Sequence, residues 1–222
     1  MRGDAMRERS GSYRYGPVLV LTVTTIVFFI AAPGSDWAYV VSALLTSSTL
    51  LAAVWTSGAS RRALVIALLV GGAAVLAALV SLASSRDASE AVVALAAGSL
   101  VAIAPVVIAR AISRAPEVTI RTVLGALTVY LLIGLCFSFV YAVVGALDDD
   151  PFFRGTSSED GADYVYFSFV TMATVGYGDL VAAEDVGRSM AVLEGILGQL
   201  YLVTVVAVAV SNLGRVRTQE PG

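Results

Sequence analysis

The sequence predicts an all-α integral membrane protein, and three observations lead to this fold class. Of the 222 residues, 58% are hydrophobic and only 14% are charged, whereas a soluble domain carries about 25% charged residues. The mean hydropathy is +0.85. Uncharged runs of about 20 residues, the length a helix needs to cross a bilayer, recur along the chain.

The composition also excludes several classes of function. Lys and Arg number 14 against 17 Asp and Glu, which gives a net charge of −3 and no basic face for nucleic acid. The chain has no His and a single cysteine, Cys136, inside an apolar run. Histidine-based catalysis, cysteine metal clusters and internal disulfides are therefore excluded, and we expect neither an enzyme nor a bound cofactor.

The apolar runs predict six membrane-spanning helices joined mostly by short connections. The first four runs form a bundle over residues 16–110, which follows an Arg-rich cytoplasmic segment at 1–15. The last two flank a longer connection, and a short cytoplasmic tail occupies 215–222. The six runs cover residues 16–33, 37–57, 63–84, 91–109, 122–147 and 189–213.

The arginines predict the orientation in the membrane, because cytoplasmic loops carry an excess of positive charge. With the N-terminus in the cytoplasm, only Arg86, Arg154 and Arg188 fall on the outer side. An even number of crossings then places both termini in the cytoplasm of a multi-pass protein of the plasma or inner membrane. The arginines on the inner side are Arg2, Arg7, Arg9, Arg14, Arg61, Arg62, Arg110, Arg114, Arg121, Arg215 and Arg217.

The connection between the fifth and sixth runs differs from the others. Residues 164–173 are apolar but too short to cross, and Asp163 before them is a residue type that caps helices, so we predict a half-crossing helix over 163–173. The Gly-containing segment that follows requires non-helical backbone at membrane depth. Such backbone is tolerated only inside protein or beside water, so it is expected to line a pore or cavity.

That segment, Thr174–Asp179, reads TVGYGD and resembles the signature of the potassium-channel pore family. The resemblance covers residues 120–214 and implies a pore domain. Its parts are an outer helix, a pore helix at 163–173, a selectivity filter at 174–179 and an inner helix at 189–213. It implies a potassium-selective channel that conducts K⁺ passively through a tetramer in the lipid bilayer.

The chemistry of the segment can be stated from its residues. Peptide oxygens can replace the water around K⁺ if they all point to one side, which Gly176 and Gly178 permit because glycine reaches left-handed dihedrals cheaply. One strand offers too few oxygens at each level, so four copies are needed and a homotetramer is expected. The predicted K⁺ ligands are the hydroxyl of Thr174 and the carbonyls of Thr174, Val175, Gly176 and Tyr177; Gly178 completes the coordinating backbone and Asp179 lies at the outer mouth. The aromatic support expected around Tyr177 comes from Tyr166, Phe167 and Phe169.

The last span supplies further pore-lining or gating candidates. Glu194 is an ionisable residue inside a span and therefore a functional candidate. Two interpretations remain open: it braces the pore helix behind the filter, or it is a protonated acid hydrogen-bonded to a neighbour. By the resemblance, Gly198 lies where an inner-helix hinge glycine is common. Helical spacing predicts a cavity lining of Gln199, Leu202, Val206 and Val210.

The fourth run, 91–109, contains no arginine, whereas a voltage sensor needs arginines at every third position. We therefore expect no conventional voltage gating, and the first four helices form either a degenerate sensor-like bundle or an assembly collar. The gating stimulus and the conductance are left open. Two alternatives also remain: a weakly selective cation channel of the same architecture, and a non-conducting assembly or sensor subunit.

Overall fold

The computed structural model describes residues 15–31, 36–57, 61–81, 103–110, 120–148, 150–155 and 159–207. Within these ranges the chain is helical, and its one extended pairing is an isolated bridge between Phe153 and Ala182. Most of the predicted fourth span, the N-terminal segment, Arg114, Val210 and the tail lie outside the described residues. The helices are α2 (Gly16–Ala31), α3 (Asp36–Thr56), α4 (Arg61–Ser81), α6 (Ile120–Leu147), α7 (Gly161–Met172) and α8 (Asp185–Tyr201), which continues into η1 (Leu202–Val206).

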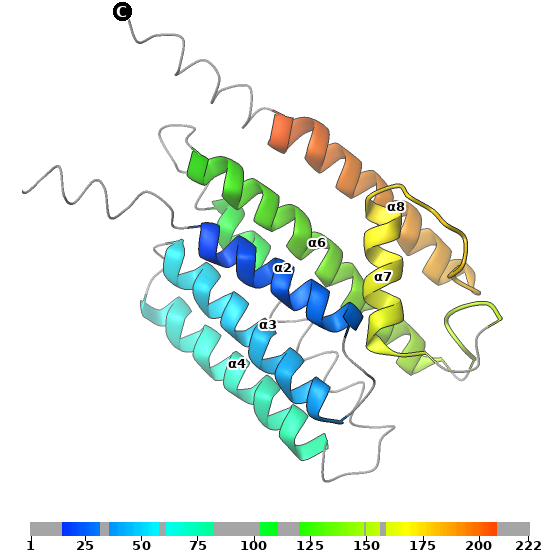
Figure 1. The fold of residues 1–222 in the computed structure, drawn as a ribbon, viewed down its shortest axis with the longest axis horizontal. Helices are drawn as coiled ribbons and strands as arrows, with labels where there is room; N and C mark the ends of the chain where they lie inside the picture. Colours follow the sequence, from blue (N-terminus) through cyan, green and yellow to red (C-terminus); the bar gives the residue numbers. More distant parts are fainter. Residues whose placement is uncertain are drawn as a thin grey trace, which may run out of the picture.

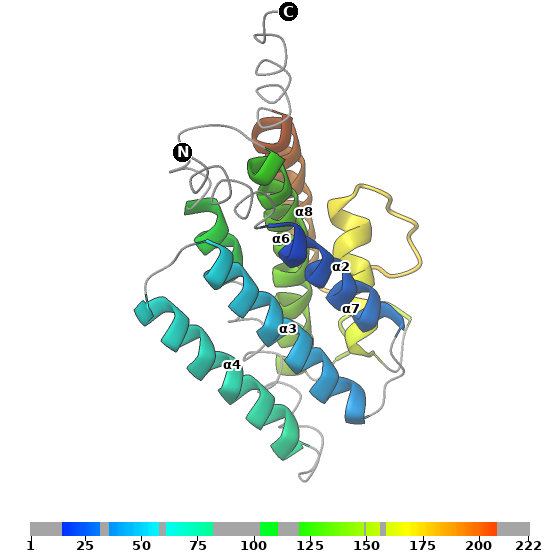
Figure 2. The same ribbon diagram turned by 60° about the vertical axis from the view of Figure 1, so that its left-hand side comes forward.

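The helices lie in a simple spatial order. Helix α4 contacts α3, α3 contacts α2, and α2 contacts α6, so these four lie side by side (Figure 1). Helix α8 also packs on α6, and the short helix α7 contacts α2, α6 and α8. The segment that follows α7 runs along the side of the molecule away from α3 and α4 (Figure 2). Helix α7 is thus held by three longer helices.

Two of the described helices are long and apolar enough to cross a membrane, Thr122–Leu147 and Asp185–Val206. The apolar parts of α2, α3 and α4 are shorter, at Gly16–Ala31, Val40–Thr56 and Leu64–Leu76. A 16-residue helix such as α2 covers about 24 Å at 1.5 Å per residue, less than the ~30 Å of hydrocarbon. Six spans therefore remain a prediction, whereas the two helices that flank α7 meet the length criterion.

The start of α7 corrects one prediction. The residue that caps this helix is Asp160 and not Asp163: the Asp160 carboxylate accepts hydrogen bonds from the backbone N–H groups of Ala162 and Asp163. Asp163 is the third helical residue, and its own carboxylate accepts from the Asp160 N–H at 3.1 Å. The two acids form a reciprocal capping box, which starts the helix at Gly161 rather than at residue 163.

The inner helix also begins earlier than its apolar run. Helix α8 starts at Asp185, four residues before the predicted boundary at residue 189. Its first turn contains Asp185 and Arg188, which hydropathy assigns to the connection, and their side chains form an exposed ion pair at 3.5 Å. Acidic groups are favoured in the first turn of a helix, because the unpaired N–H groups there give it a partial positive charge.

Candidate ion-conduction site

The segment after α7 has the backbone alternation that a carbonyl-lined filter requires. Gly176 has φ +56° and Gly178 has φ +81°. Thr174 also has a positive φ of +56°, so alternate residues of the segment lie in the left-handed region. Glycine adopts this conformation without penalty, but for an L-residue it costs roughly 1–2 kcal/mol. Strain of this kind at a β-branched residue concentrates at functional sites.

The whole filter segment, Thr174–Asp179, is exposed in the single chain. The Tyr177 side chain is 72% exposed and that of Val175 49%. A Cβ atom added at Gly176 or Gly178 would meet nothing within 4 Å. The residues that the sequence predicts as ion-coordinating therefore lie on an exposed surface of the single chain, where further copies of the chain have access.

The inner end of the filter segment is hydrogen-bonded to the pore helix. The Val170 carbonyl accepts from the Val175 N–H at 2.9 Å and from the Gly176 N–H at 3.4 Å. The Thr174 N–H donates to the Thr171 carbonyl at 3.0 Å. Any displacement of the C-terminal turn of α7 is therefore transmitted to the first residues of the filter.

The outer end of the filter is held by Tyr166 of α7. Its ring stacks on Tyr177, with centroids 6.5 Å apart and planes inclined by 6°, and its hydroxyl donates to Asp179 Oδ2 at 2.7 Å. This hydrogen bond holds the pKa of Asp179 below its usual value, because it stabilises the ionised carboxylate. Tyr166 thus contacts two residues of the segment Thr174–Asp179, and its role as an aromatic support of a filter stays a prediction.

Phe167 and Phe169, the other expected supports, do not contact Tyr177. Phe167 is buried on another face of α7, where its ring packs on Tyr141 of α6 and on Phe152 and Phe153 of the following loop. Phe169 packs with the hydrophobic core shared with α6. Both residues pack α7 against its neighbours rather than against Tyr177. Phe167 follows Tyr166 directly in the helix and therefore points in a different direction from it.

The chain after the filter is tied to the loop that follows α6. The Arg154 N–H donates to the Val181 carbonyl at 2.9 Å, and the Ala183 N–H donates to the Phe152 carbonyl at 2.8 Å. Arg188 Nε donates to the Ala182 carbonyl at 3.2 Å. The C-terminal end of the segment Thr174–Asp179 is therefore held by Tyr166, and the residues after it by this short pairing.

Glu194 is fully buried between α6, α7 and α8 and faces no open surface of the chain. Its Oε2 accepts from the Tyr141 hydroxyl of α6 at 2.6 Å. Its Oε1 makes a short hydrogen bond with the Ser168 hydroxyl of α7. Sequence reasoning identified Glu194 but not these partners, which lie 53 and 26 residues away in the chain.

A second close contact fixes the C-terminus of α7. Met172 is fully buried between two glycines: a Cβ at Gly134 of α6 would lie 2.8 Å from Met172 Cε, and one at Gly198 of α8 would lie 2.5 Å from Met172 Cγ. The Met172 carbonyl accepts from Tyr130 and from Gln199 Nε2, each at 3.4 Å. Gly198 therefore has a packing reason to be a glycine, and Gln199 lies near the inner end of the filter.

Two of the residues predicted to line the cavity, Leu202 and Val206, lie in an irregular turn of the last helix. Over Leu202–Val206 the backbone makes a π-helical turn, in which the Ala207 N–H bonds to the Leu202 carbonyl. Such a turn accommodates an extra residue and rotates the helix faces that follow. Gln199, Leu202 and Val206 are half-buried, whereas Val203 and Val205 are more exposed. The lining therefore remains a prediction.

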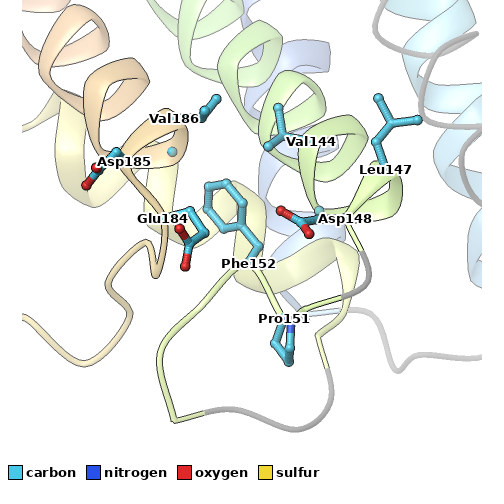
Figure 3. A pocket seen from close by; sticks show the side chains of 10 residues that line it. Val144, Leu147, Asp148, Pro151, Phe152, Glu184, Asp185 and Val186 are labelled. Carbon is cyan, nitrogen blue, oxygen red and sulfur yellow. The ribbon is translucent and has the colours of Figure 1, made fainter.

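A hollow of about 350 Å³ lies between the ends of α6 and α8, with Phe152 projecting into it (Figure 3). Three acidic residues, Asp148, Glu184 and Asp185, lie among its lining residues. The described part of the chain contains no group of three metal-ligating side chains close enough to hold an ion. No residue of the segment Thr174–Asp179 lies among the lining residues of this hollow.

The comparisons with known proteins concern the same part of the chain. Residues 125–215 match the family described as "Ion channel", and no curated protein matches the sequence. Families of ion channels are generally not enzymatic, and the match together with the long apolar helices indicates a membrane protein. The matched range contains most of α6 and all of α7, the filter segment and α8, so it supports an ion-conducting channel in this region.

Proposed function

We propose that four copies of this chain form a potassium-selective channel that conducts K⁺ passively across the cell membrane. The observation that carries the proposal is the left-handed backbone at alternate residues of TVGYGD, namely Thr174, Gly176 and Gly178. This alternation turns successive peptide carbonyls to one side, where they can replace the hydration shell of K⁺. The ligands are the Thr174 hydroxyl and the carbonyls from Thr174 to Tyr177.

The tetramer follows from the ligand count. A dehydrated K⁺ ion needs several oxygens at each level, and one strand supplies only one or two. Closed rotational symmetry around one axis brings four strands together. The exposed filter segment supports this arrangement, as does the large apolar surface that α8 leaves uncovered in the single chain, including Val192, Ile196 and Leu200. The C-terminus of α7 then directs its partial negative charge towards the axis and favours a cation there.

The gate is not a conventional voltage sensor in this proposal, since the run 91–109 lacks arginine. Both termini lie in the cytoplasm, as the distribution of arginines favours. The packing of α2 on α6 and α7 gives the N-terminal helices a direct contact with the pore region, through which they stabilise it.

The test is K⁺ flux through the purified protein in lipid vesicles, with the reversal potential measured in mixed Na⁺ and K⁺. A reversal potential close to that of K⁺ is expected. Gly178→Ala is expected to abolish selective flux, because a side chain at φ +81° is strained and the carbonyl turns away. Gly72→Ala, an exposed helical glycine with nothing within 4 Å of its added Cβ, is the matched control and should conduct normally.

Two results would replace this proposal by its alternatives. A reversal potential between those of Na⁺ and K⁺ would indicate a weakly selective cation channel. A tetramer, or a smaller assembly, that gives no flux alone but alters a co-expressed channel would indicate a non-conducting subunit. Unchanged selective flux in Gly178→Ala would remove the role assigned to the filter segment.

A further inference from the structure

The hydroxyl of Ser168 makes two short contacts, and it has only one proton. Its Oγ lies 2.7 Å from the Gly134 carbonyl oxygen of α6 and also within hydrogen-bond distance of Glu194 Oε1. Two oxygens come this close only when a proton lies between them. A carbonyl oxygen carries no proton, so the Ser168 proton must occupy the contact with Gly134.

The contact between Ser168 and Glu194 then needs a proton from another source. The Tyr141 hydroxyl cannot supply it, because its single proton is donated to Glu194 Oε2 at 2.6 Å. The remaining source is the carboxyl group itself. A protonated Glu194 donates from Oε1 to Ser168 Oγ and accepts from Tyr141 at Oε2, so three protons satisfy three contacts.

The surroundings of Glu194 favour the same protonation state. The side chain is fully buried, and the described residues place no arginine within ion-pair distance of it; the described ion pair is Arg188 with Asp185. An unpaired carboxylate inside a membrane-spanning segment is costly, whereas the neutral acid needs only hydrogen-bond partners. The partners it has are two hydroxyl groups, one on each neighbouring helix.

We propose that Glu194 is an uncharged, proton-carrying positioning residue that ties the pore helix to both neighbouring spans. The chain of hydrogen bonds runs from Tyr141 of α6 through Glu194 of α8 and Ser168 of α7 and returns to α6 at Gly134. Ser168 lies two residues before Val170, whose carbonyl holds the filter segment. The proton on Glu194 therefore helps to hold α7 in place, and α7 in turn is hydrogen-bonded to the filter segment. The expected effect of Glu194 on K⁺ flux rests on the function proposed above. The presence of the proton on Glu194 does not depend on that function.

The first test is infrared spectroscopy of the full chain in lipid at neutral pH, where exposed carboxyl groups are ionised. A carbonyl stretching band of a protonated carboxylic acid is expected, and it should vanish in Glu194→Gln. Tyr141→Phe should shift this band to higher frequency, because the acid carbonyl loses its donor. Glu184→Gln, the same change at an exposed position before α8, should leave the band unchanged. An acid band that survives in Glu194→Gln, or no band in the wild type, overturns the proposal.

The second test compares K⁺ flux in two variants that assemble like the wild type. A glutamine amide donates and accepts as the neutral acid does, so Glu194→Gln should keep flux within about twofold of the wild type. Glu194→Ala leaves both hydroxyls without their partner and should lower flux by about tenfold or more. Loss of flux in Glu194→Gln, with the wild type conducting, overturns the proposal, because a neutral side chain that donates and accepts would then not suffice at residue 194. Absence of flux in the wild type instead contradicts the proposed function and leaves the infrared result to decide on the proton.

Discussion

The pore region and the N-terminal helices use their hydrogen bonds in different ways. In α2 and α3, most threonine hydroxyls donate to the carbonyl four residues earlier in the same helix, as Thr22 does to Val18 and Thr46 to Ser42. The hydrogen bonds from α3 to its neighbours are long, at 3.3 Å for Thr49 with Thr25 of α2 and 3.3 Å for Ser47 with the Gly71 carbonyl of α4. These helices are therefore held mainly by apolar packing.

In the region of α6, α7 and α8, several hydroxyl groups bond to other elements, although those of Thr128 and Thr204 bond within their own helices. Tyr141 bonds to Glu194, Tyr201 bonds to the Ala126 carbonyl at 3.0 Å, and Tyr166 bonds to Asp179. Close backbone approach accompanies these bonds at Gly134 and Gly198. The part of the chain expected to coordinate an ion is therefore positioned by directional contacts, as a site with narrow geometric tolerance requires.

The largest effect in this comparison is expected from Gly198→Ala. The new Cβ would lie 2.5 Å from Met172 Cγ, and Met172 cannot retreat because Gly134 of α6 encloses its other end. Overpacking of a buried contact costs about 1–3 kcal/mol, so the thermal unfolding midpoint of the assembled protein should fall and K⁺ flux should decrease. Gly195→Ala, on the same helix with nothing within 4 Å, is the control and should be neutral or slightly stabilising. Equal effects of the two substitutions would contradict the close packing of Met172.

A smaller effect, visible as a pH shift, is expected from Tyr166→Phe. The hydrogen bond from the Tyr166 hydroxyl lowers the pKa of Asp179. The stabilisation that this bond gives to the folded protein is therefore fully present above the usual pKa of an aspartate, and it is lost as the pH falls through the lowered pKa. Without the hydroxyl, the pKa of Asp179 rises towards its usual value. The loss of K⁺ flux on acidifying the outer side should therefore begin at a higher pH than in the wild type.

The control for this shift is Tyr164→Phe, which removes a hydroxyl from the same helix. Tyr164 donates to Glu159 at 2.6 Å and belongs to the cluster around Phe152 rather than to the filter segment. Its loss should leave the acid profile of flux in place. A shift of similar size in both variants would mean that the profile reports the stability of α7 and not the charge of Asp179.

Those features that depend on local residue chemistry could be predicted from the sequence. The left-handed backbone at Gly176 and Gly178 follows from glycine alone, and the apolar runs lie where α2, α3, α4 and α6 form. The positive φ of Thr174 could not be predicted, because a β-branched residue disfavours it and only the surrounding structure imposes it. The sequence also could not show that Asp160 rather than Asp163 caps the helix, since both residues are aspartates and are equally good caps.

Contacts between distant parts of the chain could not be predicted either, because the surrounding tertiary structure decides them. Glu194 is conspicuous in an apolar run, but nothing local indicates that its partners are Ser168 and Tyr141. Helical periodicity predicts the stripe from Gln199 to Val210, yet it assumes 3.6 residues per turn throughout. The π-helical turn at Leu202–Val206 breaks that assumption. A single sequence therefore gives residue types and local conformations, and tertiary packing decides which of them meet.

The smallest effects are expected in the N-terminal helices, at Gly71 and Gly72. A Cβ at Gly71 would lie 3.3 Å from the Cβ of Ser47, so Ser47 would have to move by a few tenths of an ångström. A Cβ at Gly72 would have no atom within 4 Å. Replacing a helical glycine by alanine gains about 0.5–1 kcal/mol. Gly72→Ala should therefore raise the unfolding midpoint slightly, and at Gly71 the tight contact should cancel the gain. If Gly71→Ala lowered stability as much as Gly198→Ala, α3 and α4 would be fitted as closely as the pore helices, and the contrast between the two regions would fail.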